Sequence, residues 1–560
     1  MVEPTRAQLD IRDHPDLDLL VVAPAGCGKT EALALRIQGL LQRGNATPPR
    51  RILVTTFSNR ARDNIRDRLG SYLSGATMRD RVTIANFHGL SARVFRAHAS
   101  VIGLSPDLTI PDSDWVGEQC RSRSLNFNLS RAVQDLLRET KQQAVDDATV
   151  EQQLIAANLP DALDIERQRI AAGRLTYDDL PRLAELILAN DDVANLYREH
   201  FNAVIVDEFQ DLTPQQLRIV NRIGHGKTTY AGDLAQGIYG FAGARPDEIN
   251  QHIRAECSHV IEFADSLRSS PAVLGMVNML APLTGGTTLT AANPTSWPAG
   301  GLAAQTVFNT PDEEADWALK FSQFVLSCAP NHRIGIIART ATRRRFVDAV
   351  VEASNVPSYR WNDGVLDTDT ARIVKAMLSR LNVGDFQAAA DPLQHLRTAA
   401  GLDGIQDPST REALGSALNW CCDLLQQGLA TSAIKSRIRV GDESTLLSVP
   451  GVHLLTGHVG KGQQFDWVLV VGAEDGAIPD FRATTPEELQ EEARILSVML
   501  SRARHGAVMM CARSVPAAST GVAYSKLPSR FWSTIAPACV DSPTAVAWLK
   551  AASWNEISAR

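Results

Sequence analysis

The stretch LLVVAPAGCGKT, residues 19–30, decides the fold because it joins four apolar residues to a glycine-rich turn that ends in Lys-Thr. The apolar run predicts a buried strand, and the pattern that follows predicts a helix over residues 30–43. In such a strand–loop–helix, backbone N–H groups and the helix N-terminus point at phosphate groups. Lys29 would reach the β- and γ-phosphates, and the Thr30 hydroxyl would bind Mg²⁺. We therefore expect a phosphate-binding loop formed by Ala25, Gly26, Gly28, Lys29 and Thr30.

The match to the pattern GxxxxGK[ST] is incomplete, because Ala23 stands where the first glycine is expected. A chance glycine-rich turn is the alternative interpretation. A second GKT, at residues 226–228, follows a helical pattern and precedes a strand. That order is the reverse of a phosphate loop, so it predicts an ordinary turn between a helix and a strand.

A second apolar run, AVIV at residues 203–206, leads into the acidic string DEFQD at 207–211. Asp207 would hold Mg²⁺ through water, and Glu208 would orient and deprotonate the attacking water. Gln210 would sense the γ-phosphate. An acidic strand end on the surface is the alternative for this string taken alone. Together with the phosphate loop, it predicts a site that hydrolyses a nucleoside triphosphate.

Composition excludes several classes of protein. The eight cysteines of the 560 residues form no CxxC pair, which argues against a zinc or iron–sulfur site of that kind. No apolar run reaches the ~18 residues of a membrane-spanning helix, and the N-terminus lacks the apolar core of a signal peptide. We expect a cytoplasmic protein with no membrane partner. The net charge of −7 does not exclude nucleic acid, because binding depends on a local basic groove.

Alternating strands and helices predict an α/β fold with parallel sheets. Strands are expected at 19–22, 51–57, 82–85, 203–207 and 228–232, and a second α/β block begins near residue 263 with strands at 334–338, 452–456 and 467–472. Mainly helical segments interrupt the two blocks. We expect core 1 at 1–92 and 203–262 with an insertion at 93–202, and core 2 at 263–364 and 446–560 with an insertion at 365–445.

The order of these segments, from about residue 8 to 512, resembles the superfamily 1 DNA helicases of the UvrD/Rep/PcrA type. The resemblance implies two RecA-like P-loop cores. Gln8 matches the family's adenine-reading glutamine, and Arg36 matches the arginine that stacks on the adenine. TTFSN (55–59) and NFHGL (86–90) resemble the family's single-stranded DNA contacts. The DNA-binding residues implied by these two segments are Phe57, Asn59, Phe87 and His88.

The string AGDLAQGIYGF, residues 231–241, resembles the family segment GDxxQSIYxWRGA. Gln236 would couple the phosphate state to the DNA groove, while Tyr239 and Phe241 would stack on bases. Stacking of this kind contributes ~1–3 kcal/mol per base and tolerates any sequence. A pair of core aromatics is the alternative.

The second block supplies the remaining motifs. LRSS (267–270) resembles the family's YRST and makes Arg268 one arginine finger, and the segment 491–503 resembles EERRLxYVxxTRA and makes Arg502 the second. An arginine donated across a cleft can contribute ~10³–10⁵ in rate and makes hydrolysis depend on closure of the cores. LLTGHVGKGQQF (454–465) resembles LMTLHSAKGLEF. It implies DNA or nucleotide contacts by Thr456, His458, Lys461 and Gln464.

Three positions depart from the family pattern. Leu267 replaces the tyrosine that would sandwich the adenine with Arg36, Gln464 replaces a glutamate near the ribose, and Phe241 replaces a tryptophan. No catalytic carboxylate, lysine or finger is missing, so we expect an active ATPase using ATP and Mg²⁺.

The resemblance implies a 3′→5′ translocase or helicase on single-stranded or 3′-tailed duplex DNA, acting in DNA repair or anti-phage defence. The short insertion at 365–445, and the lack of an appended nuclease pattern, also resemble helicase subunits of anti-phage systems such as the Gabija helicase. The alternative is therefore an ATP-gated DNA-binding regulatory subunit of a nuclease-containing defence complex. A P-loop NTPase unrelated to nucleic acid would require the later motifs to be accidental. Backbone contacts and stacking serve DNA and RNA alike, so the sequence leaves that choice open.

Overall fold

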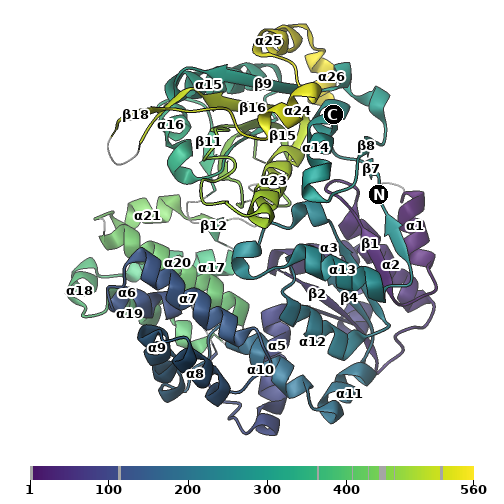
Figure 1. The fold of residues 1–560 in the computed structure, drawn as a ribbon, viewed down its shortest axis with the longest axis vertical. Coiled ribbons are helices and arrows are strands. Elements are labelled where there is room, and N and C mark those ends of the chain that lie inside the picture. Colours follow the sequence, from purple (N-terminus) through teal and green to yellow (C-terminus); the bar gives the residue numbers. More distant parts are fainter. Residues whose placement is uncertain are drawn as a thin grey trace.

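A computed structural model describes residues 4–57, 59–110, 115–361, 365–366, 368–405, 408–426, 428–440, 449–459, 461–517 and 521–560. Two six-stranded parallel sheets form the two cores, one above the other in Figure 1, and two helical groups lie beside the lower core. The predicted α/β class with two parallel-sheet cores is confirmed. No helix in the part of the chain described here is long and apolar enough to cross a membrane.

The lower sheet has the strand order β3-β2-β4-β5-β1-β6. Its strands are β1 (Leu19–Val22), β2 (Arg51–Thr56), β3 (Val82–Asn86), β4 (Phe201–Asp207), β5 (Thr228–Gly232) and β6 (Val260–Glu262). The five strands predicted from the sequence are present, and β6 is an additional edge strand. Alternate residues of β1 enter opposite layers of the core: Leu19 and Val21 on one face, Leu20 and Val22 on the other.

Helices cover both faces of this sheet. One face packs against α1 (Arg6–Asp13), α2 (Lys29–Gln42) and α3 (Asn59–Gly70). The other face packs against α5 (Phe87–His98), α10 (Asp179–Leu188), α12 (Pro214–Gly224) and α13 (Pro246–Glu256). The second GKT lies at the turn between α12 and β5, as its context predicted.

The upper sheet has the order β11-β14-β10-β15-β16-β9. Its strands are β9 (Leu302–Phe308), β10 (Arg333–Ala338), β11 (Ser358–Arg360), β14 (Gly451–Thr456), β15 (Phe465–Val470) and β16 (Ala503–Ala512). Helices α14 (Pro271–Thr284) and α23 (Pro486–Ser501) cover one face, and α15 (Pro311–Cys328), α16 (Ala341–Glu352) and α25 (Ser542–Ala551) cover the other.

The two helical groups have hydrophobic clusters of their own. The first contains α6 (Trp115–Ser122), α7 (Phe127–Lys141), α8 (Asp147–Ala156) and α9 (Pro160–Ala171). The second contains α17 (Thr368–Arg380), α18 (Val383–Ala388), α19 (Pro392–Ala400), α20 (Pro408–Gln426) and α21 (Thr431–Arg437). An ion pair between Glu118 and Arg397 joins the two groups.

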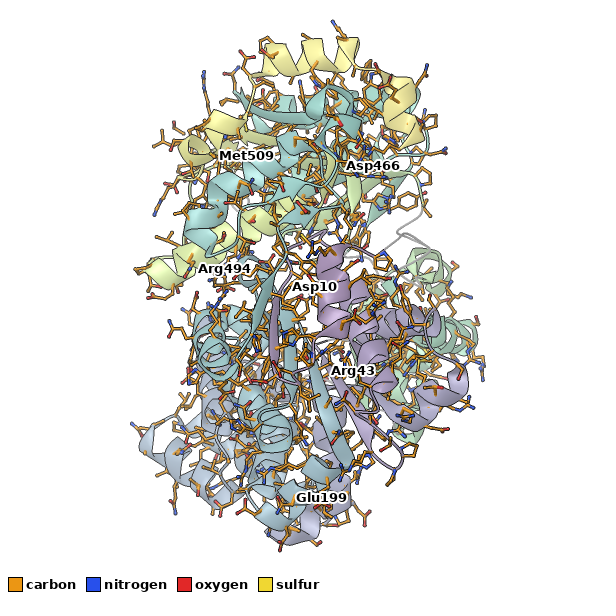
Figure 2. All side chains as sticks on the ribbon, turned by 90° about the vertical axis from the view of Figure 1, so that its right-hand side faces the viewer. Asp10, Arg43, Glu199, Asp466, Arg494 and Met509 are labelled. Carbon is orange, nitrogen blue, oxygen red and sulfur yellow. The ribbon has the colours of Figure 1, made fainter. Side chains whose placement is uncertain are left out.

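Direct contacts fix the upper core on the lower one. Arg494, labelled at the junction in Figure 2, donates to Asp247 of α13 at 2.8 Å. The backbone N–H of Gly240 donates to Glu491 at 3.0 Å. The loops after β1 and β4 also contact residues of the second block, so the carboxyl ends of these strands face the boundary between the cores.

Candidate nucleotide and DNA site

The loop between β1 and α2 has the backbone of a phosphate cradle. Gly26 and Gly28 have φ angles of 89° and 84°, in the left-handed region that side chains disfavour. A Cβ on Gly28 would lie 2.5 Å from Nε2 of Gln8, and one on Gly26 would lie 2.6 Å from Cβ of Arg268. The positive φ angles and the close neighbouring atoms therefore both favour glycine at these two positions.

Lys29 lies between the two carboxylates at the end of β4. Its Nζ is 2.9 Å from Oδ1 of Asp207 and 2.5 Å from Oε1 of Glu208. Burial lowers the pKa of Lys29, but the carboxylates more than offset burial and raise it. Burial raises the pKa of Asp207. Burial also raises that of Glu208, yet the cations Lys29 and Lys461 outweigh it and hold the Glu208 pKa at about 2.

A chain of hydrogen bonds leads away from Glu208, whose own backbone is strained at φ 59°. Gln210 donates to the Glu208 carboxylate at 2.5 Å and accepts from the backbone N–H of Asp233 at 3.0 Å. Gln236 donates to the Asp233 carboxylate at 2.9 Å. The predicted direct role of Gln210 at the γ-phosphate is not supported, because Gln210 is fully buried behind Glu208. Its contact with the cleft carboxylates is the hydrogen bond to Glu208.

These residues form one wall of a cleft with a volume of 720 Å³. The size suits a nucleotide, since ligand pockets usually measure ~300–1,000 Å³. Arg268, Lys461 and Gly462 of core 2 close the other wall. The lining residues singled out in the sequence are Ala25, Gly26, Gly28, Lys29, Thr30, Phe57, Asp207, Glu208, Gln236, Tyr239, Arg268 and Lys461.

Arg268 is partly buried and lines this cleft, and Arg502 is buried and lies outside its lining. Neither guanidinium has a carboxylate partner among the described residues. Arg502 is 2% exposed and donates to the carbonyls of Gly457 and Val459, each at 2.8 Å. Arg268 donates to Gln464 when the amide oxygen of Gln464 faces it, at 2.8 Å from Nη2. Burial lowers the pKa of each arginine to about 10. A desolvated cation without a counter-charge is costly, so Arg268, which lines the cleft, fits an anionic ligand such as a phosphate.

An aromatic pair adjoins the same cleft. The rings of Phe57 and Tyr239 stack with centroids 4.8 Å apart and planes 17° apart. Nζ of Lys461 lies 4.9 Å from the Tyr239 ring centroid and forms an ion pair with both oxygens of Asp211, at 2.7 and 2.8 Å. Asp211 and Lys461 are thus linked across the boundary between the cores. Asp211 had no assigned role in the sequence, because only the fold brings Lys461 to it.

Two family models match the chain: the UvrD/REP helicase N-terminal domain over residues 5–255 and the UvrD-like helicase C-terminal domain over residues 419–514. The chain belongs to the UvrD/Rep/PcrA-type helicases of superfamily 1. It is 26% identical to the ATP-dependent DNA helicase UvrD2 of Mycobacterium tuberculosis over 92% of this chain and 79% of the relative. It is 31% identical to the ATP-dependent DNA helicase PcrA of Leuconostoc citreum over 46% and 36%, and 29% identical to DNA helicase II of Escherichia coli K12 over 48% and 38%. This protein is accordingly an ATP-dependent DNA helicase by family.

Three residues carried over from the UvrD-type pattern lie elsewhere than predicted. Arg36 is fully buried, donates to the carbonyls of Ile11, His14 and Asp16, and cannot stack on an adenine. It follows Thr30 by six residues, which places it ~9 Å further along the helix. Phe87 is 3% exposed in the core of the lower sheet, so the prediction that it binds DNA is wrong.

The third residue is Gln8. Its amide accepts from the backbone N–H of Thr5 at 2.9 Å and donates to the carbonyl of Gly28 at 3.2 Å. Gln8 therefore supports the phosphate loop from behind. Both the oxygen and the nitrogen of its amide are hydrogen-bonded within the protein.

The structure describes the side chains of three other residues that were predicted to bind DNA: His88, Thr456 and His458. His88 packs edge-on against Tyr177, with ring centroids 5.6 Å apart, and Thr456 ends β14. His458 lies 3.3 Å from Nη1 of Arg339, and burial lowers its pKa to about 4, so it is neutral. The side chains of Asn59 and Phe241 are outside the described part of the structure.

Proposed function

We propose that this helicase moves 3′→5′ along single-stranded DNA, driven by ATP hydrolysis between its cores, and unwinds 3′-tailed duplexes in the cytoplasm. The observation that carries the proposal is the position of Tyr239. Its ring lies between Phe57 and Lys461, and all three residues also line the ATP cleft. A base-stacking surface that shares side chains with the cleft allows ATP to change the grip on DNA. The direction of travel rests on the resemblance to UvrD-type enzymes.

The residues of the cleft divide the chemistry among them. Lys29, Arg268 and Arg502 would bind the β- and γ-phosphates, and Glu208 would take a proton from the attacking water. Glu208 is a weak base while Lys29 is bound to it, because its pKa is about 2. Transfer of Lys29 to a phosphate removes the nearest cation, raises the pKa of Glu208 and makes it a stronger base.

Thr30 and Asp207 are the residues that would hold Mg²⁺. Both line the cleft, and hydroxyl and carboxylate oxygens are ligands that Mg²⁺ prefers. Bound Mg²⁺ neutralises charge on the phosphates. The hydrogen-bonded chain Glu208–Gln210–Asp233–Gln236 then connects the hydrolytic carboxylate to the segment that carries Tyr239.

ATP hydrolysis with and without single-stranded DNA tests the assignment. Lys29→Ala and Glu208→Gln should each lower DNA-stimulated turnover by at least ~10²-fold, since each removes a group that acts on the reacting phosphate or water. Matched controls are Lys227→Ala, from the second GKT, and Glu262→Gln, a surface partner of Arg254. Wild-type turnover by Glu208→Gln would overturn the assignment of the base. Loss of turnover in Lys227→Ala would show that the assay reports folding.

A second candidate is an ATP-gated DNA-binding subunit of a nuclease-containing defence complex. The small second helical group, which contacts the first group through the ion pair between Arg397 and Glu118, favours it. Strand displacement on 3′-tailed and 5′-tailed duplexes separates the candidates. Unwinding of the 3′-tailed substrate by the protein alone supports the translocase, and DNA-stimulated hydrolysis without unwinding supports the subunit.

A further inference from the structure

Three clusters of metal-binding side chains occur among the described residues, away from the ATP cleft. In the first helical group, the carboxylates of Asp147, Glu166 and Asp179 are paired with Lys141, Arg169 and Arg182. Three positive side chains therefore match three negative ones, and no charge is left for a metal ion.

The second cluster, His332, Asp466 and His505, is buried in core 2. Nδ1 of His332 accepts a hydrogen bond from Nε1 of Trp467 at 3.1 Å, and Asp466 accepts from the backbone N–H of Arg333 at 2.8 Å. The guanidinium groups of Arg333 and Arg504 each lie 3.8 Å from the Asp466 carboxylate. These cations already supply the positive charge that a metal would bring.

The third cluster differs because no arginine or lysine forms an ion pair with its carboxylate in the described structure. It comprises His14 and Asp16, between α1 and β1, and His259, which immediately precedes β6. Oδ2 of Asp16 lies 2.8 Å from Nε2 of His259 and 4.0 Å from Nδ1 of His14. Nδ1 of His14 is buried and has no hydrogen-bond partner. The imidazole rings face each other with centroids 4.8 Å apart.

The backbones that carry these three side chains are held in place. Arg36, fully buried, donates to the carbonyl of His14 at 2.6 Å and to that of Asp16. The carbonyl of His259 accepts from Leu20 of β1 at 2.9 Å. Asp18 accepts from the N–H and hydroxyl of Ser258, at 3.2 and 3.0 Å, and so ties the two segments together. Only the side chains need to adjust to bind an ion.

We propose that His14, Asp16 and His259 form a Zn²⁺ site that fastens the segment after α1 to the edge strand β6. Zinc binds imidazole nitrogens and carboxylate oxygens at ~2.0–2.2 Å, and tetrahedral geometry then sets the ligand atoms ~3.3 Å apart. The observed 2.8 and 4.0 Å differ from that spacing by about 0.5 and 0.7 Å. The Asp16 and His259 side chains are half-exposed and can move by that much, whereas the His14 side chain is 19% exposed. The fourth position is left to water. Because Gln8 of α1 holds the phosphate loop through Gly28, the ion would steady one support of that loop.

Competition between the full-length protein and a chromophoric zinc chelator, in excess Mg²⁺ to fill the magnesium site, tests the proposal. Wild type should remove one equivalent of Zn²⁺ from the chelator. His14→Gln and His259→Gln should each bind at least ~10-fold more weakly, since each removes one of three protein ligands. His252→Gln, on the exposed face of α13, should bind as wild type. Circular dichroism checks that the variants fold, and His259 is exposed enough that its loss leaves the core intact.

Cobalt supplies an independent readout of the ligands. Co²⁺ in the proposed site should give the visible d–d absorption of a four-coordinate ion, without the charge-transfer band that a cysteine ligand produces. Failure of wild type to compete for Zn²⁺ would overturn the proposal. Equal binding by His259→Gln, or a thiolate charge-transfer band, would overturn it as well.

Discussion

Replacing Lys461 with methionine should weaken the closed arrangement of the two cores. Nζ of Lys461 contacts both oxygens of Asp211 at 2.7 and 2.8 Å, and Asp211 is 2% exposed. Removing one partner of a buried ion pair costs ~3–5 kcal/mol when the other charge stays buried. Here the cleft can open and hydrate Asp211. The loss is then that of a charge-assisted hydrogen bond, ~1.5–3 kcal/mol. At 1.4 kcal/mol per factor of ten, the closed form falls about 10- to 150-fold.

A double-mutant cycle on DNA-stimulated ATP hydrolysis measures this energy. Lys461→Met and Asp211→Asn should each lower kcat by about 10- to 150-fold, and the double variant should be no worse than either single variant. The coupling energy should then be ~1.5–3 kcal/mol. Arg254→Met removes the cation of an exposed pair with Glu262 and should stay within about twofold of wild type, because exposed pairs contribute ~0–1 kcal/mol.

The same double-mutant cycle can contradict this prediction. If the two substitutions add within ~0.5 kcal/mol, Lys461 and Asp211 act independently and no tether joins the cores through them. A matching drop in thermal unfolding temperature would assign the loss to folding rather than to closure. The expected pattern is lower kcat with a nearly unchanged unfolding temperature.

Three further outcomes follow from the contacts. Burial raises the pKa of Asp211 to about 6. The ionised form of Asp211, and with it the coupling to Lys461, should therefore be present above about pH 6 and lost below it. The same double-mutant cycle, repeated at pH values on both sides of about 6, measures this loss. Because the folded pKa is raised, ionisation of Asp211 costs stability above pH 6, and protonation should not lower the unfolding temperature. Tyr239→Leu should weaken single-strand binding by ~1–3 kcal/mol in a fluorescence titration while ATP affinity changes little; equal DNA affinity would remove Tyr239 from the stacking surface. Arg36→Met should lower the unfolding free energy by ~3 kcal/mol, measured with denaturant, because it removes the donor to one buried and two partly buried carbonyls. Unchanged stability with weaker ATP binding would restore the adenine role of Arg36.

The sequence predicts the cleft well because its key residues lie at strand ends. In a parallel sheet the carboxyl ends of the strands meet at one edge. Lys29 after β1 and Glu208 after β4 therefore had to approach each other, although β5 lies between the two strands. The left-handed backbone of Gly28 also follows from the glycine itself. These inferences need only local pattern and sheet topology.

Other features depend on tertiary contacts that pattern does not encode. Strands β9 and β16 were not predicted, because β16 is rich in Ala, Met and Cys rather than β-branched residues, and short apolar runs do not distinguish a strand from a buried helix. The position of Phe87 in the segment NFHGL also led to the prediction that it binds DNA. Adjacent residues on a helix point about 100° apart, so Phe87 and His88 cannot both face the same groove, and the apolar one entered the core.

Burial of Arg268 and Arg502 gives a physical reason for linking hydrolysis to movement. Each guanidinium is desolvated and has no carboxylate partner in the described structure, so closure of the cleft is costly until an anion arrives. The phosphates of ATP would supply that counter-charge and would be the species that favours closure. Release of the cleaved phosphate would leave the arginines uncompensated again and drive the cores apart. Asp211 and Lys461 do not reproduce this effect, because their charges cancel whether or not nucleotide is bound. The arginines would therefore set when the cleft closes, and the Asp211–Lys461 pair would set how firmly it stays closed.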